Sequence, residues 1–137
     1  MILLDTHVLV WGVEESDRLG PLARAAIDRE LSAAAVKISA ITPWEIAMLA
    51  ERGRLLLRQE LFVWLSAVQG LDGLELVALT PEIALESVRL PGTFHADPAD
   101  RIIVASARVL DATLMTADRA ILSYAQAGHV RALDARQ

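Results

Sequence analysis

Short apolar runs alternate with amphipathic segments along the whole chain. Each apolar run is too short for a helix and is bounded by polar or turn-forming residues, which is typical of buried strands. The strands predicted in this way are residues 2–4, 36–39, 74–79, 113–116 and 129–133. Between them apolar residues recur at helical spacing, and the predicted helices are residues 7–13, 21–33, 42–53, 58–69, 80–89, 97–110 and 118–126. The alternation predicts an α/β fold, a three-layer α/β/α sandwich around a central parallel sheet.

Several of the predicted helices begin with clear start signals. The segment Thr42–Glu45 makes a capping box, with threonine as the cap, proline at the first helical position and glutamate three residues after the cap. Thr80–Pro81 and Asp97–Pro98 each combine a capping side chain with a proline. Residues 90–97 contain proline and glycine and are predicted to be a loop.

Length and composition set limits on the class of protein. The chain of 137 residues has no internal repeat, linker or low-complexity segment, so we expect a single domain over residues 1–137. The formal net charge of −5 argues against a broad basic surface for nucleic acid. It does not exclude a nucleic-acid enzyme, because every basic residue except Lys37 is arginine, the side chain best suited to phosphate. The chain has no cysteine, which excludes disulfides and thiolate metal sites.

No segment has the pattern of a membrane span or a secretory signal. A charged residue already stands at position 5, which is too early for a signal peptide. The longest uncharged run, Leu61–Leu71, is about half the length of a membrane span. We therefore expect a cytoplasmic protein that does not enter a membrane.

Four carboxylates stand at or just before the predicted start of a helix, namely Asp5, Glu45, Asp100 and Asp118. Three of them follow a strand directly, whereas Asp100 follows a loop. In a parallel sheet the carboxyl ends of all strands lie on one edge, so acids placed there are expected to converge. Each acid alone is explained equally well by helix capping. As a group they favour a metal site, because like charges repel and a cap can be made by serine, threonine or asparagine without that penalty.

Such a site would suit Mg²⁺ or Mn²⁺, since these hard cations prefer carboxylate oxygen. At helix N-termini the acids are expected to stay ionised and to act as ligands rather than as general acids. The expected chemistry is therefore hydrolysis by metal-bound water, with a phosphodiester as the natural substrate.

The same residues resemble the motifs of the PIN-domain family, and in particular of the bacterial VapC-type ribonuclease toxins. The matching segments contain the four acids in order along essentially the whole chain; they are Leu3–Thr6, Ile41–Ala47, His95–Ala107 and Leu114–Asp118. The resemblance implies a PIN-like fold and an endoribonuclease that uses Mg²⁺ or Mn²⁺, with Asp5, Glu45, Asp100 and Asp118 as its catalytic and metal-binding residues. It also implies an RNA substrate, a cognate antitoxin and a homodimer. Leu49 departs from the pattern, since related sequences often carry lysine there.

Five further residues are expected around the site. Thr6 and Thr116 stand beside the presumed ligands and could hydrogen-bond a carboxylate, although a turn or cap role is equally open. Asp97 is either the cap of its helix, with Arg101 as an i,i+4 partner, or an outer acid of the metal pocket, and the cap is favoured. Arg101 and His95 are the candidates for contact with substrate, but arginines on helices are most often solvated or ion-paired.

The predicted helix 58–69 carries more bulky apolar residues than one small core face requires, including Phe62, Trp64 and Leu65. Core packing is the default explanation. The alternative is a groove, shared with Trp44 and Met48, that receives an antitoxin helix.

A second function stays open at the level of sequence. A PIN-like module could bind RNA or protein without cutting, because a sequence shows possible ligands but not a bound metal. His7 and His129 have no metal-site spacing and are expected to be packed or surface residues.

Overall fold

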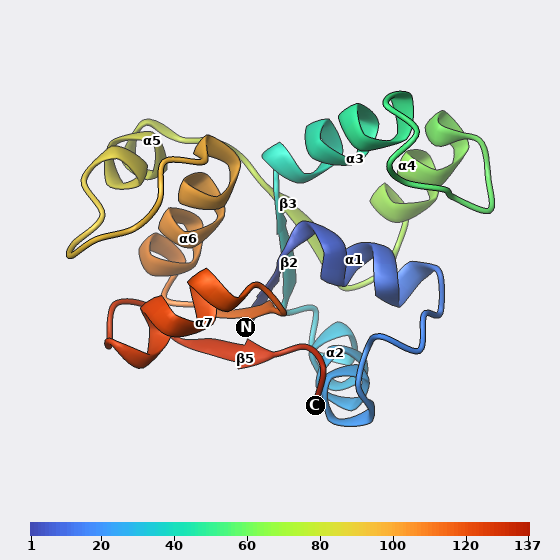
Figure 1. Ribbon diagram of the computed structural model, residues 1–137. Coiled ribbons are helices and arrows are strands. Elements are labelled where there is room, and N and C mark those ends of the chain that lie inside the picture. Colours follow the sequence, from blue (N-terminus) through green and yellow to red (C-terminus); the bar gives the residue numbers. More distant parts are fainter.

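The structure, a computed structural model, describes all residues from Met1 to Gln137 and contains one five-stranded sheet. The strands are β1 (Ile2–Leu4), β2 (Val36–Ser39), β3 (Leu74–Val77), β4 (Thr113–Thr116) and β5 (Ala132–Asp134). Their order across the sheet is β3-β2-β1-β4-β5, and every neighbouring pair is parallel. The predicted central parallel sheet is confirmed (Figure 1).

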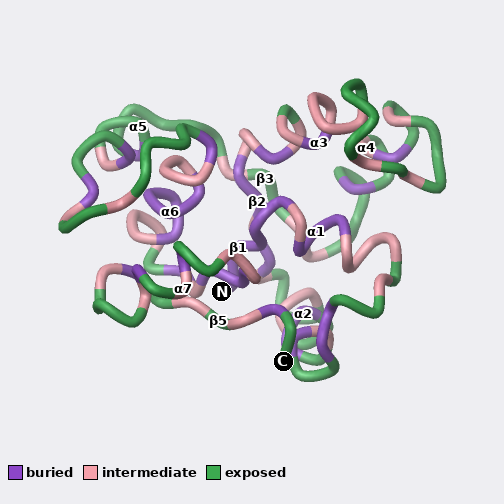
Figure 2. The backbone as a smooth tube through the Cα atoms, viewed as in Figure 1, coloured by how far each residue is buried: buried purple, intermediate pink, exposed green.

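Helices cover both faces of this sheet. They are α1 (Thr6–Val13), α2 (Pro21–Ser32), α3 (Ile41–Glu51), α4 (Leu61–Gln69), α5 (Pro81–Val88), α6 (Pro98–Leu110) and α7 (Arg119–Gln126). Because side chains alternate along a strand, Ile2 and Leu4 enter the core formed with α1–α4, whereas Leu3 enters the core formed with α5–α7. Figure 2 shows the buried residues along the strands β1, β2 and β4 and on the helix sides that face them. No helix is both long and apolar enough to cross a membrane.

β1 is the central strand because later strands are added on both sides of it. After β1 the chain adds β2 and β3 on one side, and it then returns to place β4 and β5 on the other. The carboxyl ends of β1 and β4 are therefore neighbours, with Leu4 opposite Met115. The helices that follow these two strands, α1 and α7, cover opposite faces. A switch point of this kind is where open α/β sheets bind their ligands.

The start of α3 differs from the prediction. The helix begins at Ile41, and Ala40 before it makes no side-chain cap. Thr42 is fully buried in the first turn, and its hydroxyl lies 3.0 Å from that of Thr6. Glu45 also bonds to Thr6. The predicted capping box is wrong because both side chains turn to α1 instead of to the backbone of their own helix.

α4 begins three residues later than predicted, at Leu61 rather than Arg58. The carboxylate of Glu60 accepts hydrogen bonds from the backbone N–H groups of Phe62 at 3.0 Å and Val63 at 3.1 Å. This cap defines the helix start, and it is made by a residue type that is not a preferred cap.

Two predicted strands have different bounds. β3 ends at Val77 instead of Leu79, because its only neighbour, β2, ends at Ser39 opposite Val77. β5 begins at Ala132 instead of residue 129, because pairing with β4 begins where Ala132 faces Leu114.

The last residues of the chain pack against the start of α2. The Gly20 N–H donates to the Ala135 carbonyl, and the Ala23 N–H donates to that of Gln137, both at 2.9 Å. A Cβ atom at Gly20 would lie 2.1 Å from the Gln137 oxygen, so only glycine fits. The segment after β5 is thereby tied to the helix layer formed by α1–α4.

Candidate functional site

Asp5 is the buried centre of the switch point between β1 and β4. It is 3% exposed, and both carboxylate oxygens are bonded. Oδ1 accepts from the Thr6 backbone N–H at 2.8 Å, and Oδ2 accepts from the Thr116 hydroxyl at 2.6 Å. Of the two roles left open for Thr116, the structure therefore shows the hydrogen bond to a carboxylate.

Glu45 approaches the same place from α3. Its Oε1 accepts a hydrogen bond of 2.6 Å from the Thr6 hydroxyl. Thr6 therefore joins two acids, since its backbone N–H bonds to Asp5 and its hydroxyl bonds to Glu45. Of the two roles left open for Thr6, the structure likewise shows hydrogen bonds to carboxylates.

Asp118 both caps a helix and faces the other acids. Its Oδ1 accepts from the Ile121 N–H at 3.1 Å, which caps α7. Its own N–H donates to the Thr116 hydroxyl at 2.9 Å. Thr116 thus accepts one hydrogen bond from the Asp118 N–H and donates one to Asp5. Helix capping and a place beside the other acids, two alternative explanations of Asp118 in the sequence, therefore occur together.

His7 is a residue of this site that sequence analysis missed. Its Nδ1 lies 3.7 Å from Asp5 Oδ2, and its Nε2 accepts from the Ala117 N–H at 3.0 Å. Because Nε2 is an acceptor, the neutral ring carries its proton on Nδ1, which faces Asp5. The only available signal was its place two residues after Asp5 in the first turn of a helix.

Asp100 reaches the site from the first turn of α6. Asp97 caps this helix by accepting from the Asp100 N–H at 3.0 Å, as predicted. His95 Nε2 lies 3.2 Å from Asp100 Oδ2, and His95 Nδ1 accepts from the Asp97 N–H at 3.3 Å. Asp97 is therefore a cap with its carboxylate beside the site, and His95 contacts one of the four acids.

The acids are close enough to shift one another's protonation. The pKa of Asp100 is raised to about 7, first by burial and then by repulsion from Asp5, Asp97, Asp118 and Glu45. Burial also raises the pKa of Glu45; the hydrogen bond from Thr6 opposes this rise, and repulsion from Asp5 and Asp97 adds to it. The structure thus brings these acids together at one edge of the sheet. The expectation that helix N-termini keep all four ionised is wrong for Asp100, because burial and like charge outweigh the helix dipole.

The donors suit a divalent cation in their chemistry, but their positions in this structure are too far apart to share one ion. All of the acids offer carboxylate oxygen, which Mg²⁺ and Mn²⁺ prefer. No three of the acidic and histidine side chains, as they lie, could hold one ion together. To share an ion, the carboxylates would therefore have to move towards it. The attraction between the ion and the carboxylates would then oppose the repulsion that contributes to the raised pKa of Asp100.

Comparison with known proteins identifies the family. A family model described as "PIN domain" matches residues 2–127. The chain belongs to the PIN-domain family. A curated relative, "Ribonuclease VapC22" from Mycobacterium tuberculosis, is 37% identical over 123 residues, which cover 90% of this chain and 91% of the relative. The resemblance to VapC-type PIN domains is confirmed.

Solved PIN-fold structures agree. The chain is similar to FitAcB from Neisseria gonorrhoeae with a TM-score of 0.65 and 23% identity, covering 98% of this chain and 97% of that one. It is also similar to VapBC2 from Rickettsia felis, solved bound to a DNA fragment from their promoter, with a TM-score of 0.64 and 17% identity over 97% and 98% of the two chains. At these identities the likeness establishes the fold, and the PIN-like α/β/α prediction is confirmed.

Arg101 of this PIN domain is occupied by backbone contacts and does not pair with Asp97. Its Nε donates to the Ser87 carbonyl at 2.8 Å, and its Nη1 donates to the carbonyls of Phe94 at 3.0 Å and His95 at 3.1 Å. These bonds hold the segment that precedes α6, and they give no support to the predicted contact with substrate.

The bulky residues of α3 and α4 divide between core and surface. Trp64 is 2% exposed and donates its indole N–H to Glu14 Oε1 at 2.8 Å, and Leu65 packs against the same core. Core packing is correct for these two. Phe62 and Trp44, in contrast, are 76% and 57% exposed. The PIN domain therefore presents large apolar side chains on two neighbouring helices.

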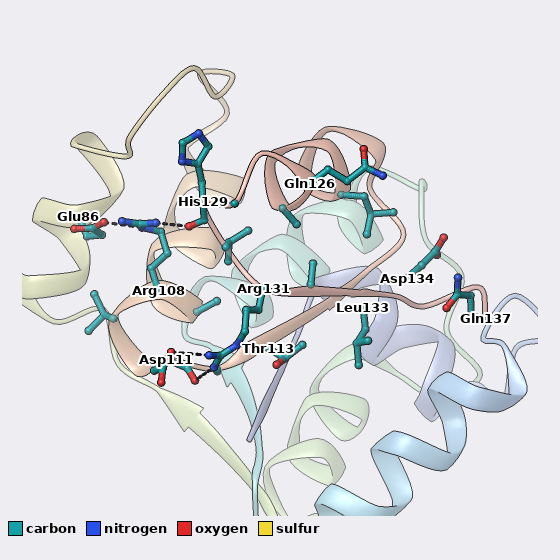
Figure 3. A pocket seen from close by; sticks show the side chains of 18 of the residues that line it. Glu86, Arg108, Asp111, Thr113, Gln126, His129, Arg131, Leu133, Asp134 and Gln137 are labelled. Atoms are coloured by element: carbon teal, nitrogen blue, oxygen red, sulfur yellow. Dashed lines mark hydrogen bonds and ion pairs between the residues drawn. The ribbon is translucent and has the colours of Figure 1, made fainter.

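A large hollow of about 1190 Å³ lies away from the four acids, beside α5, α6, α7 and β5 (Figure 3). None of the four acids lines it. Both of its arginines are paired with a carboxylate: Arg108 Nε lies 2.8 Å from Glu86 Oε1, and Arg131 Nη1 lies 3.1 Å from Asp111 Oδ1. The size of a concavity therefore does not mark the functional site of this PIN domain.

Proposed function

We propose that this PIN domain is a metal-dependent endoribonuclease, which hydrolyses RNA phosphodiester bonds and acts as the toxin of a toxin–antitoxin pair. The observation that carries the proposal is the convergence of the acids at one sheet edge, where burial and the repulsion among them raise the pKa of Asp100 to about 7. The 37% identity to a ribonuclease over 90% of the chain supports the same activity.

The metal we assign to this centre is Mg²⁺ or Mn²⁺, and its ligands are Asp5, Glu45, Asp100 and Asp118. Such an ion lowers the pKa of the attacking water and stabilises the negative charge of the transition state. Two threonines orient the carboxylates by hydrogen bonds: Thr116 bonds to Asp5, and Thr6 bonds to both Asp5 and Glu45. The protein thus fixes two carboxylates before the ion arrives.

RNA would approach the rim of this acidic centre. Arg119 is exposed and directly follows Asp118, so it places a guanidinium where a phosphate could bind. Single-stranded RNA suits such a site, because its backbone is accessible without a groove of fixed width.

The partner we assign is a cognate antitoxin that docks an amphipathic helix on the exposed side chains of Trp44 and Phe62. We further propose that the chain forms one domain over residues 1–137, works as a homodimer and acts in the cytoplasm. Light scattering on the purified protein measures the oligomer.

The second candidate is a PIN module that binds RNA or protein without cleaving. One observation favours it: no three of the acidic and histidine side chains lie ready to hold an ion.

Cleavage of single-stranded RNA by the purified protein, freed of any antitoxin, tests the proposal. We expect cleavage with Mn²⁺ or Mg²⁺, none with EDTA, and a loss of at least about 100-fold in Asp100→Asn. The matched control is Asp111→Asn at the other end of α6, where the acid pairs with Arg131 in the hollow. RNA binding without metal-dependent cleavage in the wild type would support the second candidate.

A further inference from the structure

The loop between α5 and α6 places one imidazole against one acid of the candidate site. His95 Nδ1 accepts the Asp97 N–H, so the neutral ring carries its proton on Nε2. That nitrogen lies 3.2 Å from Asp100 Oδ2. The His95 side chain is 38% exposed, so burial alone does not hold the ring in this position.

Arg101 holds the backbone that carries this ring. Its Nη1 bonds to the carbonyls of Phe94 and His95, and its Nε bonds to that of Ser87 at the end of α5. One planar guanidinium therefore ties α6, α5 and the loop together. A lysine ammonium lacks the fork geometry needed to reach all three carbonyls.

Aromatic contacts support the loop from behind. The Phe94 ring stacks on that of His95, with centroids 4.3 Å apart and planes 28° apart. Tyr124 of α7 packs on Phe94 at 4.9 Å and donates its hydroxyl to the Pro91 carbonyl. Gly92 has a φ of 66°, and a Cβ there would lie 2.7 Å from His129 Nε2. The loop is thus held by Arg101, Tyr124 and His129. Of the two positions expected for His129, packed or at the surface, the structure shows the packed one.

We propose that Arg101 is a positioning residue, which holds the loop so that His95 Nε2 stays in contact with Asp100 and orients that carboxylate for the divalent ion. The inference rests on the proposed function, since it names how one ligand of that site is set. It also replaces the sequence-based assignment of Arg101 to substrate contact.

The two roles of Arg101 make different predictions. A phosphate-binding arginine acts on RNA affinity, so its loss raises KM and lowers the slope of log affinity against log salt by about one. A positioning arginine acts through His95, so its loss lowers Mn²⁺ affinity and kcat and leaves KM for RNA unchanged.

The experiment uses Arg101→Lys, His95→Ala and the double variant. Mn²⁺ affinity, measured by calorimetry without RNA, should fall about 10-fold in each single variant. It should fall no further in the double variant, because residues that act through one contact are not additive. Histidine side-chain ¹⁵N spectra of the metal-free protein should show the Nε2–H tautomer of His95 in the wild type, and a mixture of tautomers in Arg101→Lys. Tyr124→Phe, which loses only the bond to Pro91, should cause a smaller change in the same spectra.

The matched control is Arg108→Lys, another arginine of α6 that bridges to α5 through Glu86 but does not contact His95. It should leave the His95 spectrum and Mn²⁺ affinity unchanged. Additive losses in the double variant, or a raised KM with unchanged Mn²⁺ affinity in Arg101→Lys, would overturn the inference. If the wild type binds Mn²⁺ and shows the fixed tautomer but cleaves no RNA, the nuclease proposal fails and the positioning role of Arg101 stands.

Discussion

The sheet edge at the carboxyl ends of β1 and β4 and the hollow beside β5 both gather acidic side chains, but only the hollow also contains arginines that pair with them. In the hollow each arginine has a carboxylate partner, as Arg108 has Glu86 and Arg131 has Asp111. At the sheet edge the acids have no cationic partner other than the two histidines, and repulsion contributes to the rise in the pKa of Asp100. A paired charge is neutralised by its partner within the protein, whereas a cluster of carboxylates without such partners indicates a site for a cation. The charge balance of a site is therefore more informative than its size.

The largest difference between the two regions should appear in the rate of RNA cleavage when one charged side chain of each region is replaced. Asp5→Asn keeps the shape of the side chain but removes its charge from the centre of the acids, and RNA cleavage should fall about 1000-fold. Arg131→Gln in the hollow should change cleavage less than about twofold. Initial rates on a single-stranded RNA measure both. A tenth or more of the wild-type rate in Asp5→Asn would remove the basis for calling the two regions different.

Thr116→Val should give the next largest effect. Valine has nearly the same shape, but it cannot donate to Asp5 or accept from the Asp118 N–H. Mn²⁺ affinity, measured by calorimetry, should fall about 10–100-fold. The control is Thr113→Val at the other end of β4, which lines the hollow and should leave the affinity unchanged. Equal losses in the two variants would mean that strand stability, not orientation of Asp5, is responsible.

A pH series on metal-free protein tests the unbalanced charge directly. The pKa of Asp100 is raised in the folded state, so this group's stabilising contribution is present below its ordinary pKa of 3.8 and is lost as pH rises towards about 7. Asp100→Asn cannot lose that proton, so at pH 8 it should be more stable than the wild type by about 1–2 kcal/mol, and at pH 4 by much less. Urea unfolding at both pH values measures the difference. If Asp111→Asn in the hollow gave the same pH dependence, the effect could not be assigned to the cluster.

The smallest effect belongs to the paired charges. A double-mutant cycle on Glu86→Gln and Arg108→Met should give a coupling of about 0–1 kcal/mol, because both side chains are partly exposed. The coupling should weaken with added salt. A coupling much above this range would show that the hollow, too, stores substantial electrostatic energy.

Much of the fold follows from local pattern. The apolar runs and the helical spacing placed every strand and helix, because each must bury one face or stripe. The errors occur where a distant residue overrules a local signal. Thr42 and Glu45 have the pattern of a capping box, yet both bond to Thr6 from a different helix. α4 begins at a glutamate cap that propensities do not favour.

The site divides in the same way. The convergence of Asp5, Glu45 and Asp118 could be predicted because residues that follow parallel strands lie at one edge of the sheet; Asp100 follows a loop, and its motif suggested its place. The elevated pKa of Asp100 could not, since it depends on burial and on distances among four other acids. Arg101 was assigned to substrate contact because it is adjacent to Asp100. Its actual partners are backbone carbonyls, and no residue spacing reveals a bond of that kind.

The hydrogen bond between Thr116 and Asp5 joins residues 111 positions apart. Asp5 is synthesised 111 residues before the hydroxyl that orients it, and the neighbouring Asp118 follows two residues after that hydroxyl. A nascent chain that has not yet released β4 therefore has an incomplete centre, so the cleavage we propose cannot begin before that strand folds.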